Sequence, residues 1–301
     1  MDYFSIDIGG TFIKYGVVDH SGVLLSSNKI KTPATLSEFI EGVFQLIMPV
    51  KDRIKGIGVS VPGKVDTRTG VIYFGGALNY LHKCPLKKII EEKFNIRCEL
   101  SNDGKAAALA ELWLGNLKGV KHGAAIVLGT GVGGGLIING ELFQGSDYQA
   151  GELSFMIPSS KFVNENDMLG MSHSAINFIK KATEMLGISD ATDGMSVFKY
   201  IKNKQNTKVN KLFDSYCEKI AILIINLQAV LDISTVVIGG GISQDPILID
   251  NIIIHYKNIR KKSKIIELSL KLMTIKSCRF LSDANLLGAV YQLLSVIDQE
   301  N

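Results

Sequence analysis

Three glycine-rich segments each follow a predicted strand: Gly9-Gly10-Thr11, Gly129 to Gly135, and Gly239 to Gly241. A phosphate group needs backbone N–H donors at close range, and glycine lacks the Cβ atom that would block its approach. The hydroxyl group of Thr11 would add a further donor. An ordinary hairpin turn explains any one of these segments. Three of them in a single chain favour a site that holds phosphate groups.

These segments do not match the two best-known phosphate-binding motifs. None fits G-x-x-x-x-G-K-[ST], the phosphate loop of many ATPases and GTPases. None fits G-x-G-x-x-G between a strand and a helix with an acidic residue about 20 positions later, the pattern of dinucleotide-binding proteins. The sequence therefore indicates a phosphate site of another kind.

Three acidic residues could do chemistry near these turns. Asp7 ends the first predicted strand, where it would either cap the turn or orient a magnesium ion at the terminal phosphates of a nucleotide. Asp103 follows Asn102 at the start of a predicted helix, where an N-cap role and a catalytic role as proton acceptor are compatible. Glu152 would either bind sugar hydroxyls or lie in a surface loop.

The predicted elements contain a repeat. A strand, a glycine–threonine turn and a second strand occur at residues 3–18, and the same order returns from residue 123 to an Asn-Gly hairpin turn at residue 140. We predict strands at 3–8, 12–18, 23–30, 54–61, 96–100, 123–128, 136–139, 235–238 and 271–276. We predict helices at 36–48, 85–94, 104–114, 172–187, 208–231, 246–259 and 284–297. The repeat predicts two related lobes.

Composition excludes several classes of protein. The chain has 301 residues, of which 46% are hydrophobic, and this argues against disorder. The net charge is only +4, and the densest basic run, Lys257 to Lys264, is interpreted as a solvated helix end. The four cysteines form no C-x-x-C pair, and no apolar stretch reaches the length of a membrane span. We therefore expect a soluble, cytoplasmic protein with no nucleic-acid or membrane partner.

Taken together, the motifs resemble those of the ROK family of sugar kinases and sugar-responsive repressors, which belongs to the actin-like ATPase superfamily. The matching segments occur in the family's order over nearly the whole chain: Asp7 to Lys14, Gly58 to Asp66, Asn102-Asp103, Leu128 to Gly135, Gly151-Glu152, Val237 to Ser243, and Asp283 to Ala289. Each segment is a weak signal alone, whereas the ordered set is specific.

The resemblance implies an α/β fold of the two-lobed actin-like ATPase (ribonuclease H-like) type with a central cleft. We expect a small N-terminal lobe over residues 1–112, joined by the C-terminal helix 284–301, and a large C-terminal lobe over residues 113–283. The first phosphate motif begins at residue 7, which we interpret as evidence against the DNA-binding extension of the repressors.

The resemblance also implies the chemistry. Asp103 would be the catalytic base in a transfer of the γ-phosphoryl group from ATP, with Mg as the metal cofactor held by Asp7 through the phosphates. The residues expected at the sugar are Gly63, Asn79, Asn102, Asp103 and Glu152. The residues expected at ATP are Asp7, Gly9, Gly10, Thr11, Lys14, Thr130, Gly131, Gly239 and Gly240.

The chain departs from the family pattern at several positions. Phe155 stands where the family often has a histidine that contacts sugar and zinc, and residues 156–175 contain no cysteine, so we expect no structural zinc. Phe155 would either shape an open sugar pocket or fill the core. Ser101 and Lys105 stand where Glu and Asn are usual, and helical spacing places Lys105 about 200° from Asp103, which argues against a direct catalytic effect.

The expected substrate is a hexose hydroxyl, with O6 of glucose or of a β-glucoside preferred. An N-acetylmannosamine kinase and a fructokinase are alternatives of the same class. A sugar-sensing protein without catalysis is the alternative of another class. Because members of the family are often dimers, a homodimer is also compatible with the resemblance.

Overall fold

The computed structural model describes residues 2–160 and 162–300, and this part of the chain forms two compact units. The first unit comprises the chain up to Lys118, Leu142–Gly151, and the chain from Ser282 onward. The second unit comprises Gly119–Glu141 and Glu152–Leu281. None of the helices in the described residues combines the length and the apolar run that crossing a bilayer requires.

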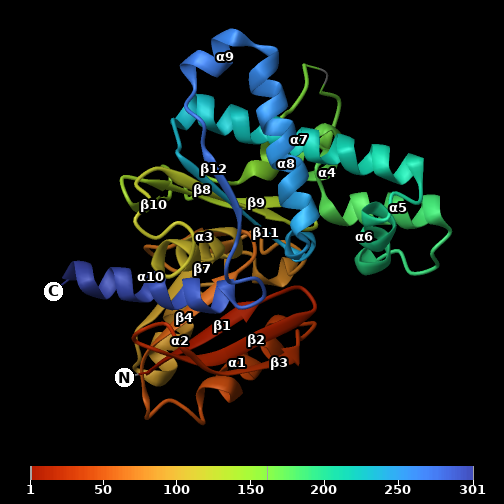
Figure 1. Ribbon diagram of the computed structural model, residues 1–301. Helices are drawn as coiled ribbons and strands as arrows, with labels where there is room; N and C mark the ends of the chain where they lie inside the picture. The colour runs from red at the N-terminus through yellow and green to blue at the C-terminus, as the bar shows by residue number, and fades with distance from the viewer. Residues whose placement is uncertain (1, 161, 301) are drawn as a thin grey trace. The chain divides into compact units, whose positions relative to one another are not determined.

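The first unit is built on a five-stranded sheet in the order β3-β2-β1-β4-β7 (Figure 1). β1 pairs antiparallel with β2 and parallel with β4, and β4 pairs parallel with β7. The strand bounds are β1 Asp2–Ile8, β2 Phe12–Asp19, β3 Leu24–Lys31, β4 Ile54–Val61 and β7 Cys98–Asn102. A two-stranded sheet, β5 Lys64–Asp66 and β6 Val71–Tyr73, follows β4 in the chain.

The second unit has a sheet of the same design, in the order β10-β9-β8-β11-β12. β8 pairs antiparallel with β9, and β11 pairs parallel with both β8 and β12. The bounds are β8 Gly123–Leu128, β9 Val132–Ile138, β10 Glu141–Phe143, β11 Thr235–Gly239 and β12 Thr274–Ser277. In both sheets an antiparallel hairpin with a glycine turn precedes the parallel strands, so the repeat predicted from the sequence is confirmed.

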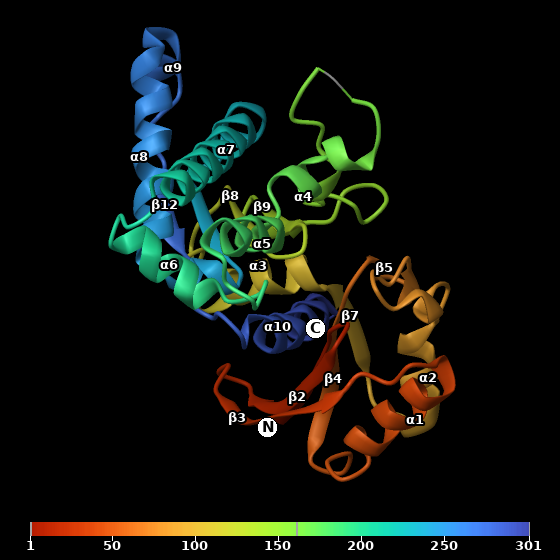
Figure 2. The ribbon, with the colours of Figure 1, turned by 90° about the vertical axis from the view of Figure 1, so that its right-hand side faces the viewer.

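Helices cover both faces of the first sheet (Figure 2). Ile57 and Val59 of β4 join a core cluster with residues of α1 and α2, such as Phe39 and Ile90. The intervening residue Gly58 faces α10 on the other side of the sheet. This alternation follows from the two-residue period of a strand. The helix bounds are α1 Leu36–Ile47, η1 Asn79–Leu81, α2 Leu86–Phe94, α3 Asp103–Trp113 and α10 Ala284–Glu300.

The second unit carries the remaining helices. The longest of them, α7, begins at an Asn206 cap whose side chain accepts hydrogen bonds from two backbone N–H groups, and it has the buried apolar stripe of a core helix. The bounds are η2 Leu153–Phe155, η3 Glu165–Asp167, α4 Leu169–Ser172, α5 Ala175–Leu186, α6 Gly194–Lys202, α7 Thr207–Leu231, η4 Gly241–Gln244, α8 Pro246–Lys262 and α9 Lys264–Ser269.

Three sequence predictions are wrong in detail. The strand expected at 136–139 already begins at Val132, so the glycines from Gly133 onward lie inside β9 and not in the turn. Helix α6 was not predicted. The basic run is not a fully solvated helix end, because Arg260 is buried and its guanidinium donates to the backbone oxygens of Glu267 and Lys271.

α10 approaches α3 and the sheet very closely in the first unit. A Cβ atom at Gly288 would lie 1.8 Å from the backbone oxygen of Ala106 in α3, and one at Gly58 would lie 2.4 Å from that of Ala289 in α10. The hydroxyl group of Ser5 in β1 also donates to the backbone oxygen of Leu286 at 2.7 Å. Glycine is therefore required at both contacts, and α10 fixes the position of α3 on the sheet.

Gly288→Ala should destabilise the protein by about 2 kcal/mol, because the added methyl group must push α10 away from α3. Gly42→Ala is the matched control, since Gly42 also lies inside a helix but its Cβ would meet only a Pro33 side-chain atom at 3.7 Å. That control should be stabilising by roughly 0.5–1 kcal/mol. Urea denaturation of both variants measures the difference, and equal midpoints would contradict the close packing.

Candidate active site

The first glycine turn joins β1 to β2 and is fixed by hydrogen bonds. The N–H group of Gly9 donates to Phe12 O at 3.0 Å, and Thr32 donates through its hydroxyl to Gly9 O at 2.7 Å and through its N–H to Thr11 O at 3.0 Å. Gly10 and Thr11 are exposed. The turn is thus rigid at its base and open to a ligand at its tip.

Asp7 lies just before this turn, and its carboxylate is held by side chains rather than by the turn. Oδ1 accepts from Ser60 Oγ at 2.9 Å and from Asn285 Nδ2 at 3.0 Å. Burial raises the pKa of this carboxyl group, and the two hydrogen bonds and the charge of Lys14 oppose that rise. The turn-capping interpretation of Asp7 is therefore wrong. An oriented carboxylate beside a glycine turn can hold a hard cation.

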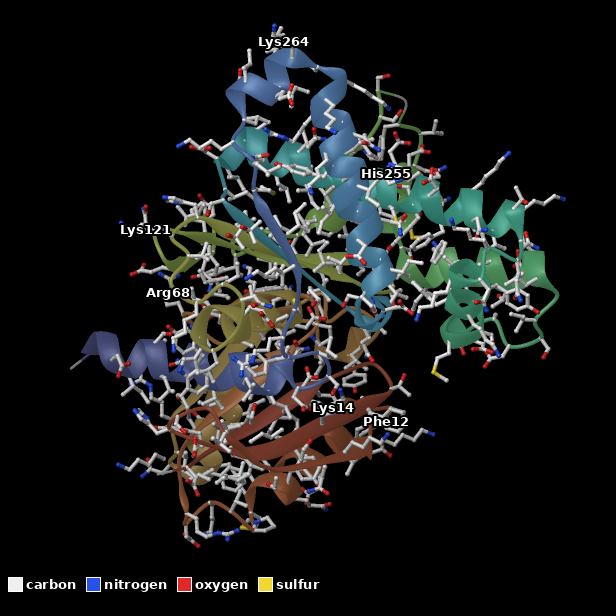
Figure 3. The ribbon with its side chains drawn as sticks, in the orientation of Figure 1. Phe12, Lys14, Arg68, Lys121, His255 and Lys264 are labelled. Carbon is white, nitrogen blue, oxygen red and sulfur yellow. The ribbon has the colours of Figure 1, made fainter. Side chains whose placement is uncertain are left out.

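Lys14 projects from β2, on the same strand as Phe12 (Figure 3). Its ammonium group donates to the backbone oxygen of Ser282 at 3.0 Å. Its positive charge also lowers the pKa of Asp7. The side chain thus stands close to the Asp7 carboxylate, as a residue expected at the phosphates should.

Asp103 is the first residue of α3, and its neighbour Asn102 is the N-cap. The expectation that Asp103 itself caps the helix is therefore wrong. Asn102 Oδ1 accepts from Lys105 N at 3.1 Å, while its amide group donates to Gly63 O at 2.9 Å and to Asp103 Oδ1 at 3.0 Å. Gly104 N also donates to Asp103 Oδ1, at 2.8 Å. These contacts orient the carboxylate at a helix N-terminus.

The environment of Asp103 makes it a better base than an ordinary aspartate. Its side chain keeps access to solvent, but the surrounding protein removes much of its hydration. This desolvation is the largest effect, and with the negative charge of Asp7 it raises the pKa of Asp103 to about 6. The hydrogen bonds from Gly104 and Asn102 work in the opposite direction. A carboxylate of this kind can accept a proton near neutral pH.

The structure brings three of the residues expected at the sugar together: Gly63, Asn102 and Asp103 are linked by hydrogen bonds. Gly63 has φ of +89°, and a Cβ atom there would lie 1.9 Å from Phe74 O, so only glycine fits. Asn79 begins η1 in the same unit and is exposed. Among the described residues, no hydrogen bond joins the Asn79 side chain to these three.

The second glycine turn, between β8 and β9, lies in the second unit. Gly129 N donates to Gly131 O at 3.0 Å, and Gly129 O accepts from Ala175 N, the first residue of α5, at 3.0 Å. Thr130 is exposed at the tip. Ser154 is packed against the turn, since its hydroxyl accepts from Val132 N at 2.9 Å. The segment that carries Glu152, the N-cap residue of η2, is thereby fixed beside the turn.

Gly239 and Gly240 have a structural reason to be glycines. A Cβ atom at Gly240 would lie 2.0 Å from Leu128 O, and φ is +100° at this position. A Cβ atom at Gly239 would lie 3.0 Å from the sulfur of Cys278. These residues let the end of β11 approach the end of β8. The next residue, Gly241, has open space around it.

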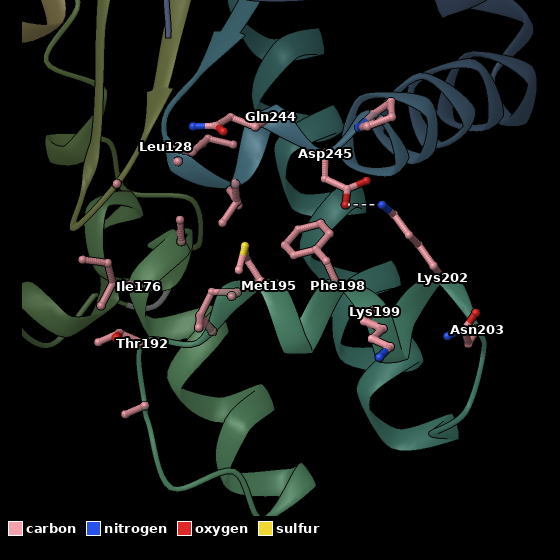
Figure 4. Close-up of a pocket in the computed structure, with 18 residues that line it drawn as sticks. Leu128, Ile176, Thr192, Met195, Phe198, Lys199, Lys202, Asn203, Gln244 and Asp245 are labelled. Atoms are coloured by element: carbon pink, nitrogen blue, oxygen red, sulfur yellow. Dashed lines mark ion pairs between the residues drawn. The ribbon is translucent and has the colours of Figure 1, made fainter. Parts of the chain in front are cut away.

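A cavity with a volume of about 920 Å³ lies in the second unit (Figure 4). Met195 and Phe198 point into it from α6, and Lys202 of α6 forms an ion pair with Asp245 at 2.7 Å. The lining residues are Leu128, Gly129, Ala175, Ile176, Ile179, Ala191, Thr192, Gly194, Met195, Phe198, Lys199, Lys202, Asn203, Gly241, Ile242, Gln244, Asp245 and Pro246. An apolar cavity with a few polar groups suits a planar base and its ribose.

Most residues of this cavity were not predicted from the sequence. None of Thr130, Gly131, Gly239 and Gly240 lines it, although their direct neighbours Gly129 and Gly241 do. Helix α6 forms one wall, and its buried residues Val197, Phe198 and Ile201 have a helical spacing that could have revealed it.

Phe155 is 65% exposed in η2, so the interpretation that it fills the core is wrong. It offers an apolar ring to solvent three residues after Glu152. Within the described residues, no group of three or more His, Cys, Asp or Glu is arranged to hold a metal ion.

The chain is similar to known proteins over most of its length. The ROK family model matches residues 3–294. A β-glucoside kinase of Listeria monocytogenes is 28% identical over 298 residues, which cover 98% of each chain. An uncharacterized protein of Clostridium perfringens is 34% identical over 79% of this chain and 80% of that one.

Comparison with a solved structure shows that the similarity includes the fold. A ROK family protein from Streptococcus pneumoniae, crystallised in complex with sucrose, has a TM-score of 0.88 and 27% identity, with 99% of this chain and 100% of that one covered. Such solved neighbours have the actin-like ATPase fold, which confirms the predicted fold class. With the family match over nearly its whole length, the chain belongs to the ROK family.

Proposed function

We propose that this protein is an ATP-dependent sugar kinase, which transfers the γ-phosphoryl group of ATP to a hydroxyl group of a hexose. The observation that carries the proposal is the Asp103 carboxylate, held by Asn102 and Gly104 and raised in pKa to about 6. Relatives named β-glucoside kinase and glucokinase support the same class of reaction.

In this proposal Gly63, Asn79, Asn102 and Asp103 of the first unit bind the sugar. For Glu152 a role at the sugar is proposed from the family resemblance alone. The amide group of Asn102 already holds both Gly63 O and Asp103 Oδ1, so the carboxylate needs no reorganisation before it acts. Asp103 then accepts the proton of the attacking hydroxyl as the bond to phosphorus forms.

Each unit contributes residues to the proposed ATP contacts. In the second unit the cavity beside α6 would take the adenosine, and Gly239 and Gly240 are expected near it. Gly9, Gly10 and Thr11 of the first unit, and Thr130 and Gly131 of the second, have backbone and hydroxyl donors suited to phosphate. Lys14 supplies positive charge near Asp7. Asp7 would hold a Mg²⁺ ion, which neutralises charge on the phosphates during transfer. Because ATP is the donor, we place the reaction in the cytoplasm.

A β-glucoside or glucose is the favoured sugar, with O6 as the favoured hydroxyl. N-acetylmannosamine and fructose remain alternatives, because the residues at the sugar do not discriminate among them. A sugar sensor without catalysis is the alternative of another class, and the intact Asp103 disfavours it. A homodimer is proposed from the family alone.

Asp103→Asn should lower sugar-dependent ATP turnover by roughly 10²–10⁴-fold, because an amide cannot accept the hydroxyl proton. The variant keeps an oxygen for the Gly104 N–H, so sugar affinity measured by calorimetry and the urea midpoint should stay close to those of the wild type. Asp52→Asn, at an exposed position, is the matched control. Retention of more than about a third of the activity by Asp103→Asn would refute its role.

The kinase activity should also fall below about pH 6. The raised pKa of Asp103 means that the carboxyl group gains a proton as the pH drops through about 6, and the protonated form cannot act as a base. We expect kcat/KM for the sugar to fall about tenfold per pH unit below that point. Circular dichroism at each pH controls for unfolding, and a flat profile down to pH 4.5 would contradict the assignment.

The exposed Phe155 predicts tolerance for a substituent at C1 of the sugar, since its ring can pack on a second sugar ring. We expect kcat/KM for cellobiose and methyl β-glucoside within about 10³-fold of that for glucose, with N-acetylmannosamine measured in parallel. Phe155→Ala should lower the value for cellobiose more than that for glucose. Rejection of all C1-substituted sugars by more than 10³-fold, about 4 kcal/mol, would leave a strict free-hexose kinase.

A further inference from the structure

Lys105 is a buried cation that the proposed chemistry does not use. It lies on α3 two residues after Asp103, and only 2% of it is exposed. Its ammonium group donates to Gln144 Oε1 at 3.0 Å and to Tyr148 O at 2.7 Å. Lysine is almost never buried to this extent without specific partners. Both of these partners lie in one segment, residues 142–151, called the 142–151 loop below.

Two further contacts hold the 142–151 loop to the rest of the first unit. Asp147 forms an ion pair with Lys64 at 2.5 Å, but the Asp147 side chain is 76% exposed. The side chain of Tyr148 is hydrogen-bonded to Asp66. Exposed ion pairs contribute little because water screens them, whereas a buried charged group whose contacts are lost leaves a large penalty. Of the two lysines, Lys105 therefore contributes more to holding the loop in place.

The backbone of the loop is adapted to this contact. Tyr148 has φ of +55°, which is uncommon for a large side chain, and Gly145 and Gly151 also have positive φ. The residue with this unusual backbone conformation, Tyr148, is also the one whose carbonyl oxygen accepts the hydrogen bond from Lys105. Gly151 ends the loop, and the next residue in the chain is Glu152.

Resting on the proposed function, we propose that Lys105 is a positioning residue for sugar binding, which fixes the 142–151 loop against the first turn of α3, where Asp103 lies. It does not touch the reacting atoms. Its ammonium group holds the loop by two hydrogen bonds, and Asn102 and Asp103, which are proposed to bind the sugar, lie just before Lys105 in the chain. A displacement of about 1 Å in a ligand-positioning group can cost on the order of 10²-fold.

The test compares Lys105→Met with Lys64→Met, two variants that each remove one ammonium group from the same loop. Lys105→Met should raise KM for the sugar by about 10-fold or more, with KM for ATP within about twofold of the wild type. Lys64→Met should change neither KM by more than about threefold. Hydrogen exchange should become faster in the 142–151 loop of Lys105→Met and remain unchanged in α3.

Gln144→Ala provides a second variant in case Lys105→Met does not fold. It removes one of the two acceptors and leaves the ammonium group paired with Tyr148 O, so a smaller rise in KM for the sugar is expected. Equal effects of the Lys105 and Lys64 substitutions would overturn the proposal. A parallel rise in KM for ATP, or a shift of the acid limb of the pH profile that points to a direct effect on Asp103, would overturn it as well.

The same measurements separate this proposal from the proposed function. Wild-type protein that shows no sugar-dependent ATP turnover would defeat the proposed function, and with it the role of Lys105 in sugar binding. Active wild-type protein combined with an unchanged KM in both Lys105→Met and Gln144→Ala would defeat the positioning role alone. In either case, the rate of hydrogen exchange in the 142–151 loop of Lys105→Met shows whether Lys105 holds the loop in place.

Discussion

The partial desolvation of the Asp103 carboxylate is the constraint on which the rest of the site depends. A carboxylate gives up hydration only where fixed protein groups hold it, and here Asn102 and Gly104 do so at the first turn of α3. That turn is placed by the close contact of Gly288 in α10 with Ala106 in α3. The contact with α10 thus fixes the start of α3, about 180 positions earlier in the chain, through packing that tolerates no extra methyl group.

The repeated sheet gives the chain two glycine turns of the same design, of which only the first has an acidic residue beside it. Each turn joins a pair of antiparallel strands, closed by Ile8↔Ile13 in the first unit and by Leu128↔Val132 in the second. The residue before the first closing position is Asp7, whereas the residue before the second is the apolar Val127. The backbone design of the turn recurs, but the side chain beside it differs, so a cation-binding carboxylate is proposed only for the first unit.

The local part of this design was predictable from the sequence and the long-range part was not. Glycine turns after apolar strands, and an Asn-Asp pair at the start of an alanine-rich helix, are local patterns. Both are found in the structure, although the second turn is shorter than predicted because β9 begins at Val132. The choice of Asn102 over Asp103 as the cap depends on Gly63 O, which lies 39 residues away. The burial of Lys105 likewise depends on Gln144 and Tyr148. The sequence near residue 105 does not predict that these distant residues are its partners. Helix α6 was missed because it is short and lies outside every motif.

The central claim is that Asp103 titrates near pH 6 because of its surroundings. Labelling the aspartate side-chain carboxyl carbons with ¹³C and following their NMR shifts with pH measures this directly, and Asp103→Asn identifies the signal by its loss. The account predicts a carboxyl group with a pKa of about 6, well above the ordinary value of 3.8. A signal for Asp103 that titrates at or below 3.8 would show a fully hydrated or ion-paired carboxylate, and it would contradict the assignment of Asp103 as a base tuned by desolvation.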